Sequence, residues 1–268
     1  MPAKTRRVVI EERILELGQV DFASLAREFG VSEMTIRRDI EALEDKGVAK
    51  RVLGGAIAFS GKSWEPPFES RAAEAAPEKA HIATAAASLL QPGETALFDS
   101  GSTVLAVARA VKGRGLGLTV VTPSILVALE LADEPDTTVL LTGGRVRPSE
   151  LSLVGPETEA AFALYNCDTY LMGIAGVDAA HGVSDYHREE GSMKRAAMNA
   201  ADRVIVVADE SKLGRVQLMN IAPLAALSVL VTDGDPEHPT LVAARKAGVE
   251  VVCVDAPAEA TRPAGQGA

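Results

Sequence analysis

The sequence predicts an α/β protein in two parts: a small helical head that ends in a hairpin, and a larger α/β domain with a mostly parallel sheet. Residues 3–58 carry three helical patterns followed by a short basic hairpin. From residue 95 onward, seven short apolar runs alternate with helical patterns. Strands that are apolar throughout and alternate with helices are typical of a parallel sheet covered on both faces.

The charge distribution limits how this chain can meet a nucleic acid. Its 268 residues carry 27 Lys and Arg against 37 Asp and Glu, a net charge of −10. Residues 1–60 hold ten basic and ten acidic side chains, so the whole negative excess lies in the remainder. Any contact with DNA therefore has to come from a local basic patch in the head, because phosphates repel the acidic bulk.

The head, residues 1–60, divides into three helices by its apolar spacing and capping residues. The first helix is expected over residues 3–17, and the second over 23–29 with Gly30 as its C-cap. Ser32 is a good N-cap for the third helix, which runs to Gly47. The apolar side chains expected to be buried are Val9, Ile10, Ile14, Leu17, Leu25, Ala26, Phe29, Ile36, Ile40 and Leu43.

The larger domain is expected over residues 78–255, after an extended linker over 61–77 that contains Pro66 and Pro67. Its predicted strands are Thr95–Asp99, Leu118–Thr122, Thr137–Thr142, Thr169–Ile174, Val204–Ala208, Ser228–Thr232 and Glu250–Val254. Its predicted helices cover residues 78–90, 103–112, 124–132, 190–201 and 239–247. Residues 256–268 are rich in Pro, Ala and Gly, which predicts a disordered tail.

The third helix and the hairpin have the composition of a surface that reads DNA. A helix that begins with small polar and basic side chains can enter the major groove and reach base edges. Its candidate contacts are Ser32, Glu33, Thr35, Arg37 and Arg38, and the hairpin adds Lys50 and Arg51. The alternative is a solvated face on which the arginines pair with Glu33 or Glu41. The caps and the basic hairpin together favour DNA binding.

Residues 6–57 resemble the winged helix-turn-helix of the DeoR/GlpR family of bacterial transcriptional regulators. The residues that carry the resemblance are Ile14-Leu15, Gly18-Gln19-Val20, Leu25-Ala26, Phe29, Val31-Ser32, Thr35-Ile36-Arg37-Arg38-Asp39, Leu43-Glu44, Gly47 and Gly54-Gly55-Ala56. Leu53 departs from the pattern, because the family commonly has His or another polar or aromatic residue before the two glycines. The resemblance therefore does not carry the family's wing contact over to Leu53.

Three loops of the larger domain suit an anionic ligand. Asp99-Ser100-Gly101-Ser102-Thr103 joins a strand to a helix, where backbone N–H groups can bind anionic oxygens or form an ordinary N-cap. Gly143-Gly144 and the loop 173–178 follow predicted strands too, and ligands of open α/β sheets bind at those ends. Lys194 and Lys212 are the candidate cations. For Lys194, an i,i+4 pair with Glu190 is the alternative.

These loops also resemble the effector domain of the DeoR/GlpR family. The matching stretches are Pro92-Gly93-Glu94, Asp99-Ser100-Gly101-Ser102-Thr103, Val121-Thr122, Gly143-Gly144, Ser152-Leu153-Val154-Gly155-Pro156, Gly176-Val177-Asp178, Lys194-Arg195 and Asp209-Glu210-Ser211-Lys212. The resemblance implies a Rossmann-like fold similar to ribose-5-phosphate isomerase A and a phosphorylated sugar as effector. Ser100, Gly101, Ser102 and Thr103 then hold the phosphate near Lys212, and Asp99, Asp178 and Lys194 face the sugar hydroxyls. Pro123 stands where the family often has Asn, which points to a different ligand.

The expected function is a sequence-specific repressor of carbohydrate metabolism genes, which binds double-stranded operator DNA as a homo-oligomer and responds to a phosphorylated sugar. The alternative is a sugar-phosphate isomerase with an appended head, using Asp99, Asp178, Glu190 and Lys194. We expect no enzyme activity, cofactor or membrane contact, and a cytoplasmic location. We also expect no metal, although a metal site is the alternative for the polar cluster His181, Asp185, His187, Glu189 and Glu190.

Overall fold

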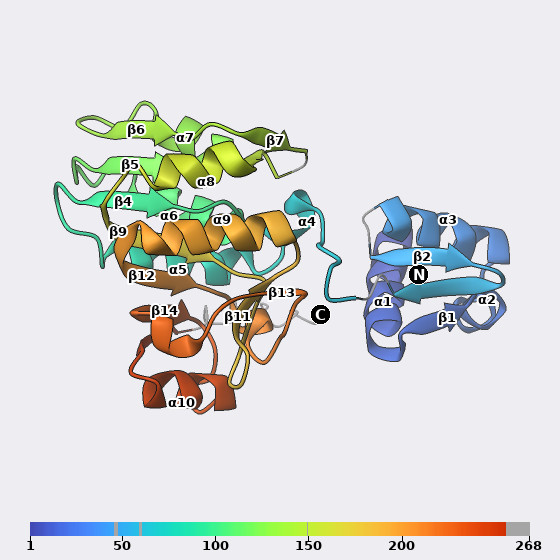
Figure 1. The fold of residues 1–268 in the computed structure, drawn as a ribbon. Helices are drawn as coiled ribbons and strands as arrows, with labels where there is room; N and C mark the ends of the chain where they lie inside the picture. Colours follow the sequence, from blue (N-terminus) through green and yellow to red (C-terminus); the bar gives the residue numbers. More distant parts are fainter. Residues whose placement is uncertain (46–47, 59–60, 149, 256–268) are drawn as a thin grey trace, which may run out of the picture. The chain divides into compact units, whose positions relative to one another are not determined.

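The computed structural model describes residues 1–45, 48–58, 61–148 and 150–255 (Figure 1). The chain divides into two compact units, Met1–Ala73 and Glu74–Ala268. Within the stretch that the sequence predicts to be a linker, α4 (Phe68–Ala73) is helical and α5 begins at Ala76. The predicted tail, 256–268, lies outside the described residues.

The first unit has the predicted order of three helices and a hairpin. Its elements are α1 (Ala3–Leu17), β1 (Gln19–Asp21), α2 (Phe22–Phe29), α3 (Glu33–Asp45), β2 (Ala49–Val52) and β3 (Gly55–Ala58). The three strands form an antiparallel sheet in the order β1-β3-β2. The side chain of Asp21 caps α2 by accepting from Ser24 N at 2.8 Å, and Gly30 ends the helix in the left-handed conformation.

The core of the first unit lies between its helices and its small sheet. Ile10, Ile14, Ile36 and Ile40 are fully buried there, as their helical spacing predicts. The predicted burial of Leu17 is wrong: this last residue of α1 is 62% exposed, because the helix ends before another element covers it. The remaining members of the core are Phe22, Leu25, Ala26, Leu43, Val48, Ala49, Ala56 and Ala58.

The second unit is built on a seven-stranded sheet in which every neighbouring pair is parallel. Its strands are β4 (Thr95–Phe98), β5 (Thr119–Thr122), β6 (Thr138–Leu141), β9 (Cys167–Gly173), β12 (Ala201–Val207), β14 (Val229–Thr232) and β15 (Glu250–Cys253). Each corresponds to one of the seven apolar runs, so the predicted α/β fold class is confirmed. Their order is β15-β14-β12-β9-β4-β5-β6.

Helices cover both faces of this sheet. Its helices are α5 (Ala76–Ala87), α6 (Ser102–Val111), α7 (Ile125–Leu131), α8 (Pro156–Phe162), α9 (Arg188–Asn199) and α10 (Pro239–Lys246). Consecutive helices α5, α6 and α7 contact one another, and α8 contacts α9 on the opposite face (Figure 1). Two-sided cover explains why the strands are apolar along their whole length.

Five short strands outside the main sheet have no counterpart in the sequence prediction. They are β7 (Arg145–Arg147), β8 (Ser152–Val154), β10 (Gly176–Asp178), β11 (Gly182–Asp185) and β13 (Met219–Ala222). β7 pairs with β8, and β10-β11-β13 forms a separate antiparallel sheet. Strands of three or four residues that include polar side chains have too little periodicity to be read from the sequence.

Candidate functional sites

The third helix of the head presents the predicted contact residues on its outer face. Ser32 Oγ accepts from Thr35 N at 3.2 Å, so the predicted N-cap is present. Ile36 and Ile40 point into the core, whereas Glu33, Arg37 and Arg38 are exposed. The helix is thereby anchored by its apolar side and leaves its polar side open.

The two adjacent arginines of α3 differ in their surroundings. The guanidinium of Arg37 lies 4.5 Å from the centroid of the Phe22 ring, and its Nη2 is 3.8 Å from Glu33 Oε2. Arg38 is exposed and makes no ion pair with any residue that the structure describes. The salt-bridge alternative thus holds for Arg37, while Arg38 is available to a partner.

The hairpin β2–β3, which we call the wing, carries the two other predicted basic contacts. Arg51 Nε lies 2.5 Å from Glu44 Oε2, and Arg51 N donates to Glu44 Oε1 at 3.1 Å. The Arg51 backbone N–H and guanidinium lower the pKa of the Glu44 carboxyl. Lys50 is exposed, without an ion pair in the described part of the chain. Arg51 therefore ties the wing to α3, and Lys50 is its open cation.

In the second unit, two of the three predicted ligand loops, those after β4 and β9, lie where the strand order of the sheet reverses. The strands after β4 run outward to one side as β5 and β6, and the chain then returns to place β9 on the other side of β4. The carboxyl ends of β4 and β9 therefore form the switch point at which open α/β sheets bind ligands. Asp99 follows β4, and Gly173 ends β9.

A buried ion-pair network occupies this switch point. Lys194 Nζ lies 2.5 Å from Asp99 Oδ2 and 3.3 Å from Asp185 Oδ2, and it donates to Gly173 O at 2.9 Å. Glu190, the partner that a simple i,i+4 pair requires, binds Arg147 instead. Sequence reasoning named Asp99, Lys194 and the loop that begins at Gly173, but it assigned no part to Arg147.

The network holds more negative than positive charge. Burial raises the pKa of Asp99 and of Asp185, and Lys194 offsets only part of that effect. Burial alone would lower the pKa of Lys194, but Asp99, Asp185 and Glu190 together raise it. The lysine is consequently a fixed cation that holds α9 to the carboxyl ends of β4 and β9.

The turn after Asp99 leads directly into α6. Asp99 Oδ1 accepts from Ser100 N at 2.8 Å, and Oδ2 accepts from Gly173 N at 3.2 Å. The carboxylate thus fixes the backbone at the start of the turn and links it to the end of β9. Gly101 is the N-cap, with φ +106°, and no side chain caps the helix. The first N–H groups of α6 are therefore donors without an intrahelical acceptor, next to the half-buried Ser102 and Thr103.

The other predicted site residues lie farther from this turn. Gly143-Gly144 follows β6 and Lys212 follows β12, each two strands from β4 and thus roughly 10 Å away across the sheet. A Cβ on Gly144 would lie 2.1 Å from Thr158 Oγ1, so this glycine is required for packing against α8. Asp178 Oδ1 accepts from Ala180 N and His181 N, both at 2.9 Å, at the turn of the β10–β11 hairpin.

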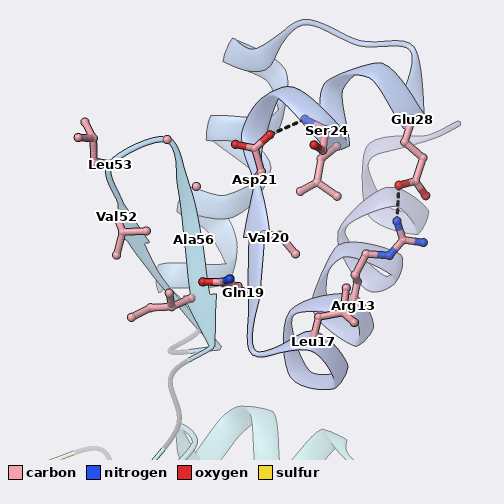
Figure 2. A pocket seen from close by; sticks show the side chains of 14 residues that line it. Arg13, Leu17, Gln19, Val20, Asp21, Ser24, Glu28, Val52, Leu53 and Ala56 are labelled. Carbon is pink, nitrogen blue, oxygen red and sulfur yellow. Dashed lines mark hydrogen bonds and ion pairs between the residues drawn. The ribbon is translucent and has the colours of Figure 1, made fainter.

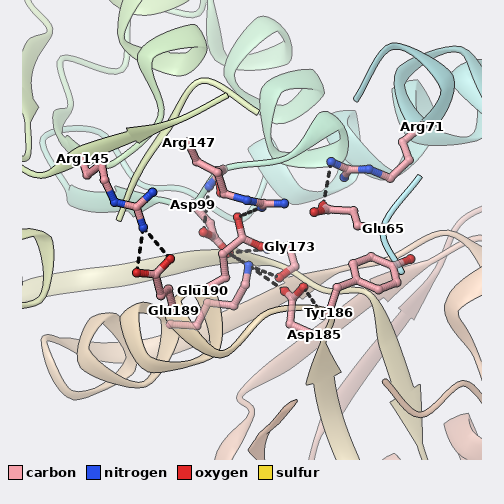
Figure 3. A network of polar contacts seen from close by, with 12 residues as sticks. Glu65, Arg71, Asp99, Arg145, Arg147, Gly173, Asp185, Tyr186, Glu189 and Glu190 are labelled. Atoms are coloured by element: carbon pink, nitrogen blue, oxygen red, sulfur yellow. Dashed lines mark hydrogen bonds and ion pairs between the residues drawn. The ribbon is translucent and has the colours of Figure 1, made fainter. Parts of the chain in front are cut away.

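Two arginines that sequence reasoning did not single out connect β7 to α9 (Figure 3). Arg145 Nη2 contacts both carboxylate oxygens of Glu189, at 2.8 and 2.7 Å. Arg147 pairs with the buried Glu190. The only signal in the sequence is their i, i+2 spacing, which places both side chains on one face of a strand.

Within the described ranges, no group of three or more His, Cys, Asp or Glu side chains is arranged to hold a metal ion. No helix in the described part of the chain has the length and hydropathy needed to cross a bilayer.

A helix-turn-helix with a wing, joined to an α/β domain with an open helix start at its switch point, defines the class of ligand-responsive DNA-binding regulators. The profile of the DeoR-like helix-turn-helix domain matches residues 6–62, and that of the DeoR C-terminal sensor domain matches residues 74–234. The chain belongs to the DeoR family of transcriptional regulators, and it is a DNA-binding regulator, as the sequence predicts.

The relatives that match this chain over most of its length are named as transcriptional regulators. The HTH-type transcriptional regulator GlpR of Haloferax volcanii is 34% identical over 94% of this chain and 98% of its own. The glycerol-3-phosphate regulon repressor of Escherichia coli K12 is 31% identical over 85% and 89%. Among solved structures, ribose-5-phosphate isomerase A of Methanocaldococcus jannaschii matches 50% of this chain and 53% of its own at 16% identity, with a TM-score of 0.36. That match is too partial to bear on activity.

Proposed function

We propose that this protein is a repressor of carbohydrate metabolism genes and that a phosphorylated sugar, bound at the switch point of the sensor domain, controls its affinity for operator DNA. The observation that carries the proposal is the N-terminus of α6, which begins at Ser102 after its N-cap Gly101, close in the chain to the ion pair of Asp99 with Lys194. Relatives of the chain include a glycerol-3-phosphate regulon repressor. Because the target is chromosomal DNA, the protein acts in the cytoplasm.

The charges of the site determine how such a ligand lies. Asp99, Asp185 and Glu190 outnumber Lys194 and Arg147, so the buried network repels a phosphate group. The phosphate therefore binds the α6 N–H groups and the hydroxyls of the turn Ser100-Gly101-Ser102-Thr103, where the helix dipole favours an anion. Sugar hydroxyls, which donate hydrogen bonds, face the carboxylates. The outer residues of the proposed site are Gly143, Gly144, Asp178 and Lys212.

Control of DNA binding requires that the ligand prefer one of two arrangements of the protein. The operator-bound form is a symmetric homo-oligomer, dimer or tetramer, that places one α3 in each half-site. Ligand favours an arrangement in which the two helices no longer match the half-site spacing. A coupling of about 1–3 kcal/mol changes the operator affinity roughly 5- to 150-fold.

The proposal is tested with the full chain and a duplex selected from a random library by the protein itself. DNA affinity is measured by fluorescence anisotropy with and without pentose, hexose and triose phosphates, the unphosphorylated sugars and inorganic phosphate. We expect at least one sugar phosphate, and none of the unphosphorylated sugars, to change the affinity. If every phosphorylated compound leaves both DNA affinity and melting temperature unchanged, the proposed effector class is wrong.

A variant pair locates the ligand. Ser102→Glu places a carboxylate in the proposed anion site and is expected to abolish the response while DNA binding persists. Thr84→Glu adds the same charge on the exposed surface of α5 and should respond like the parent protein. A normal response in Ser102→Glu would move the site elsewhere.

We propose further that the chain has no enzyme activity of its own, since its curated relatives are named transcriptional regulators. Aldose–ketose interconversion of pentose and hexose phosphates should be absent at high protein concentration. Turnover that Asp178→Asn abolishes would establish the isomerase alternative.

A further inference from the structure

The tip of the wing presents an apolar side chain to solvent. The strands β2 and β3 are joined by the two-residue turn Leu53-Gly54, in which Gly54 has φ +81°. Leu53 is 106% exposed, and the neighbouring Val52 is 42% exposed. Figure 2 shows Leu53 at the end of the hairpin. Nothing in the described part of the chain covers this side chain.

The tip is held rigidly by the rest of the head. Gly54 O accepts a hydrogen bond from Phe22 N, the first residue of α2, at 3.0 Å. A Cβ on Gly55 would lie 2.1 Å from Val20 O, so β3 packs against β1 more closely than any other residue would allow. The two glycines have different tasks: Gly54 makes the turn and Gly55 permits the close approach. Leu53 is therefore displayed at a defined place beside the helix-turn-helix.

The wing has little cationic character left at its tip. The guanidinium of Arg51 is bound to Glu44 and lies 3.6 Å from Glu41, which neutralises it. Lys50 is the remaining open cation, and it lies near the start of β2. An isobutyl group cannot donate to a phosphate, so the tip is unsuited to the contacts that wings make with the DNA backbone.

We infer that Leu53 is a minor-groove contact: the wing lays this side chain against the bases and sugars of the groove beside the site read by α3. Proteins that bind the minor groove often insert Leu, Ile, Phe or Met at a base step, and pyrimidine–purine steps are the easiest to unstack. The contact reads deformability at a position that α3 does not touch. It rests on the DNA-binding role of the family and is independent of the effector.

A single exposed leucine is ordinary on a protein surface. Leu53 differs from the others because it stands on a rigid hairpin, in the domain that binds DNA, at the end of the chain segment that also carries Lys50. The unit belongs to a DNA-binding family, so a duplex is the partner that this surface is expected to meet. Burying the side chain against a groove removes most of its area from water.

The test uses the full chain and sequence selection from a random duplex library. The parent protein should select a conserved half-site with a flanking preference for pyrimidine–purine or A·T-rich steps at the wing position. Leu53→Ser should keep the half-site, lose the flanking preference and bind about 10-fold more weakly, the effect of withdrawing part of one leucine side chain from its contact. Its dependence on salt should be unchanged, because no charge is removed.

Two further variants make the result decisive. Leu53→Met retains an apolar side chain of similar volume and should bind like the parent protein. Leu17→Ser replaces another leucine of the same unit, 62% exposed, and should leave affinity and base preference unchanged. Melting curves of all three variants should coincide with that of the parent protein, since both positions are exposed.

Unaltered affinity and flanking preference in Leu53→Ser would overturn the inference, as would an equal loss in Leu53→Met. A parent protein that selects no sequence at all would contradict the DNA-binding role itself. The two failures are therefore distinguishable.

Discussion

Replacing Lys194 by Met removes the cation that holds the sensor domain together at its switch point. The ammonium group is buried and contacts Asp99 and Asp185. Methionine has nearly the same length and no charge, so it leaves two buried carboxylates without the cation that pairs with them and with only backbone N–H donors. Lys194→Met is therefore expected to destabilise the second unit severely, even though it fills the same space.

The size of the effect follows from the two distances. At an effective dielectric constant near 20, separations of 2.5 and 3.3 Å correspond to gross attractions of about 7 and about 5 kcal/mol. The desolvation of the lysine, which methionine avoids, cancels more than half of this sum. Breaking a buried pair by removing one partner costs about 3–5 kcal/mol, and we expect a loss in that range.

The single tryptophan allows the two units to be followed separately. Trp64 belongs to the first unit, so its fluorescence reports on that unit during urea unfolding. Far-UV circular dichroism reports on both units. The variant should show an earlier transition by circular dichroism and an unchanged one by Trp64 fluorescence. The matched control is Lys112→Met, which removes an exposed lysine of the same unit.

The pH dependence gives a second readout. Burial raises the pKa of Asp99 and Asp185 in the folded state, and removing Lys194 raises it further. A carboxyl whose folded pKa is raised destabilises the protein at high pH, and this penalty is relieved as pH falls through the folded pKa. The loss relative to the parent protein should thus be full at pH 8 and smaller at pH 5. A loss below about 1 kcal/mol, or one that grows as pH falls, would refute this account of the network.

Three other substitutions probe the first unit and the β10–β11 hairpin of the second unit. Arg38→Ala should lower operator affinity by about 1–3 kcal/mol, measured by anisotropy, and should weaken the base preference at one position of the selected site. Operator affinity and base preference equal to those of the parent protein would contradict a contact of Arg38 with a base. Gly55→Ala forces β3 away from β1 and should lower the free energy of unfolding followed by Trp64 fluorescence by about 1–3 kcal/mol. It should also weaken DNA binding. An unchanged midpoint of unfolding would mean that β3 can shift without cost. Asp178→Ala removes the acceptor at the β10–β11 turn and should cost about 1 kcal/mol in circular-dichroism melts at neutral pH. The hydrogen bond from His181 lowers the pKa of Asp178, so this difference should persist above the ordinary Asp pKa and vanish as pH falls through the lowered one; a difference that is constant down to pH 2 would exclude the capping role.

The helices and the main-sheet strands are readable in the sequence because their signals are local, whereas the five short strands outside the main sheet are not. The i, i+4, i+7 spacing of Ile36, Ile40 and Leu43 predicts the buried side of α3, and Ser32 marks its start. The seven apolar runs predict a parallel sheet, because only strands covered on both faces lack polar alternation. The predicted turn after β4 is likewise a local pattern, a strand followed by glycine, hydroxyls and a helix.

What each charged residue does was decided by tertiary structure. Arg37 and Arg38 are neighbours in the sequence, yet only Arg37 lies over the Phe22 ring and close to Glu33, while Arg38 is exposed. Lys194 has Glu190 at the right helical spacing, but its partners are Asp99, 95 residues away, and Asp185.

The sequence by itself thus determined the two-part architecture, the third helix of the helix-turn-helix and the strand-to-helix turn of the proposed ligand site, because these depend on periodicity and capping within a few residues. Tertiary structure alone decided that β4 and β9 lie side by side and that Gly143-Gly144 and Lys212 lie two strands away. It also decided that Arg147 reaches Glu190. These depend on strand order and on contacts between distant elements, which no local pattern of side chains specifies.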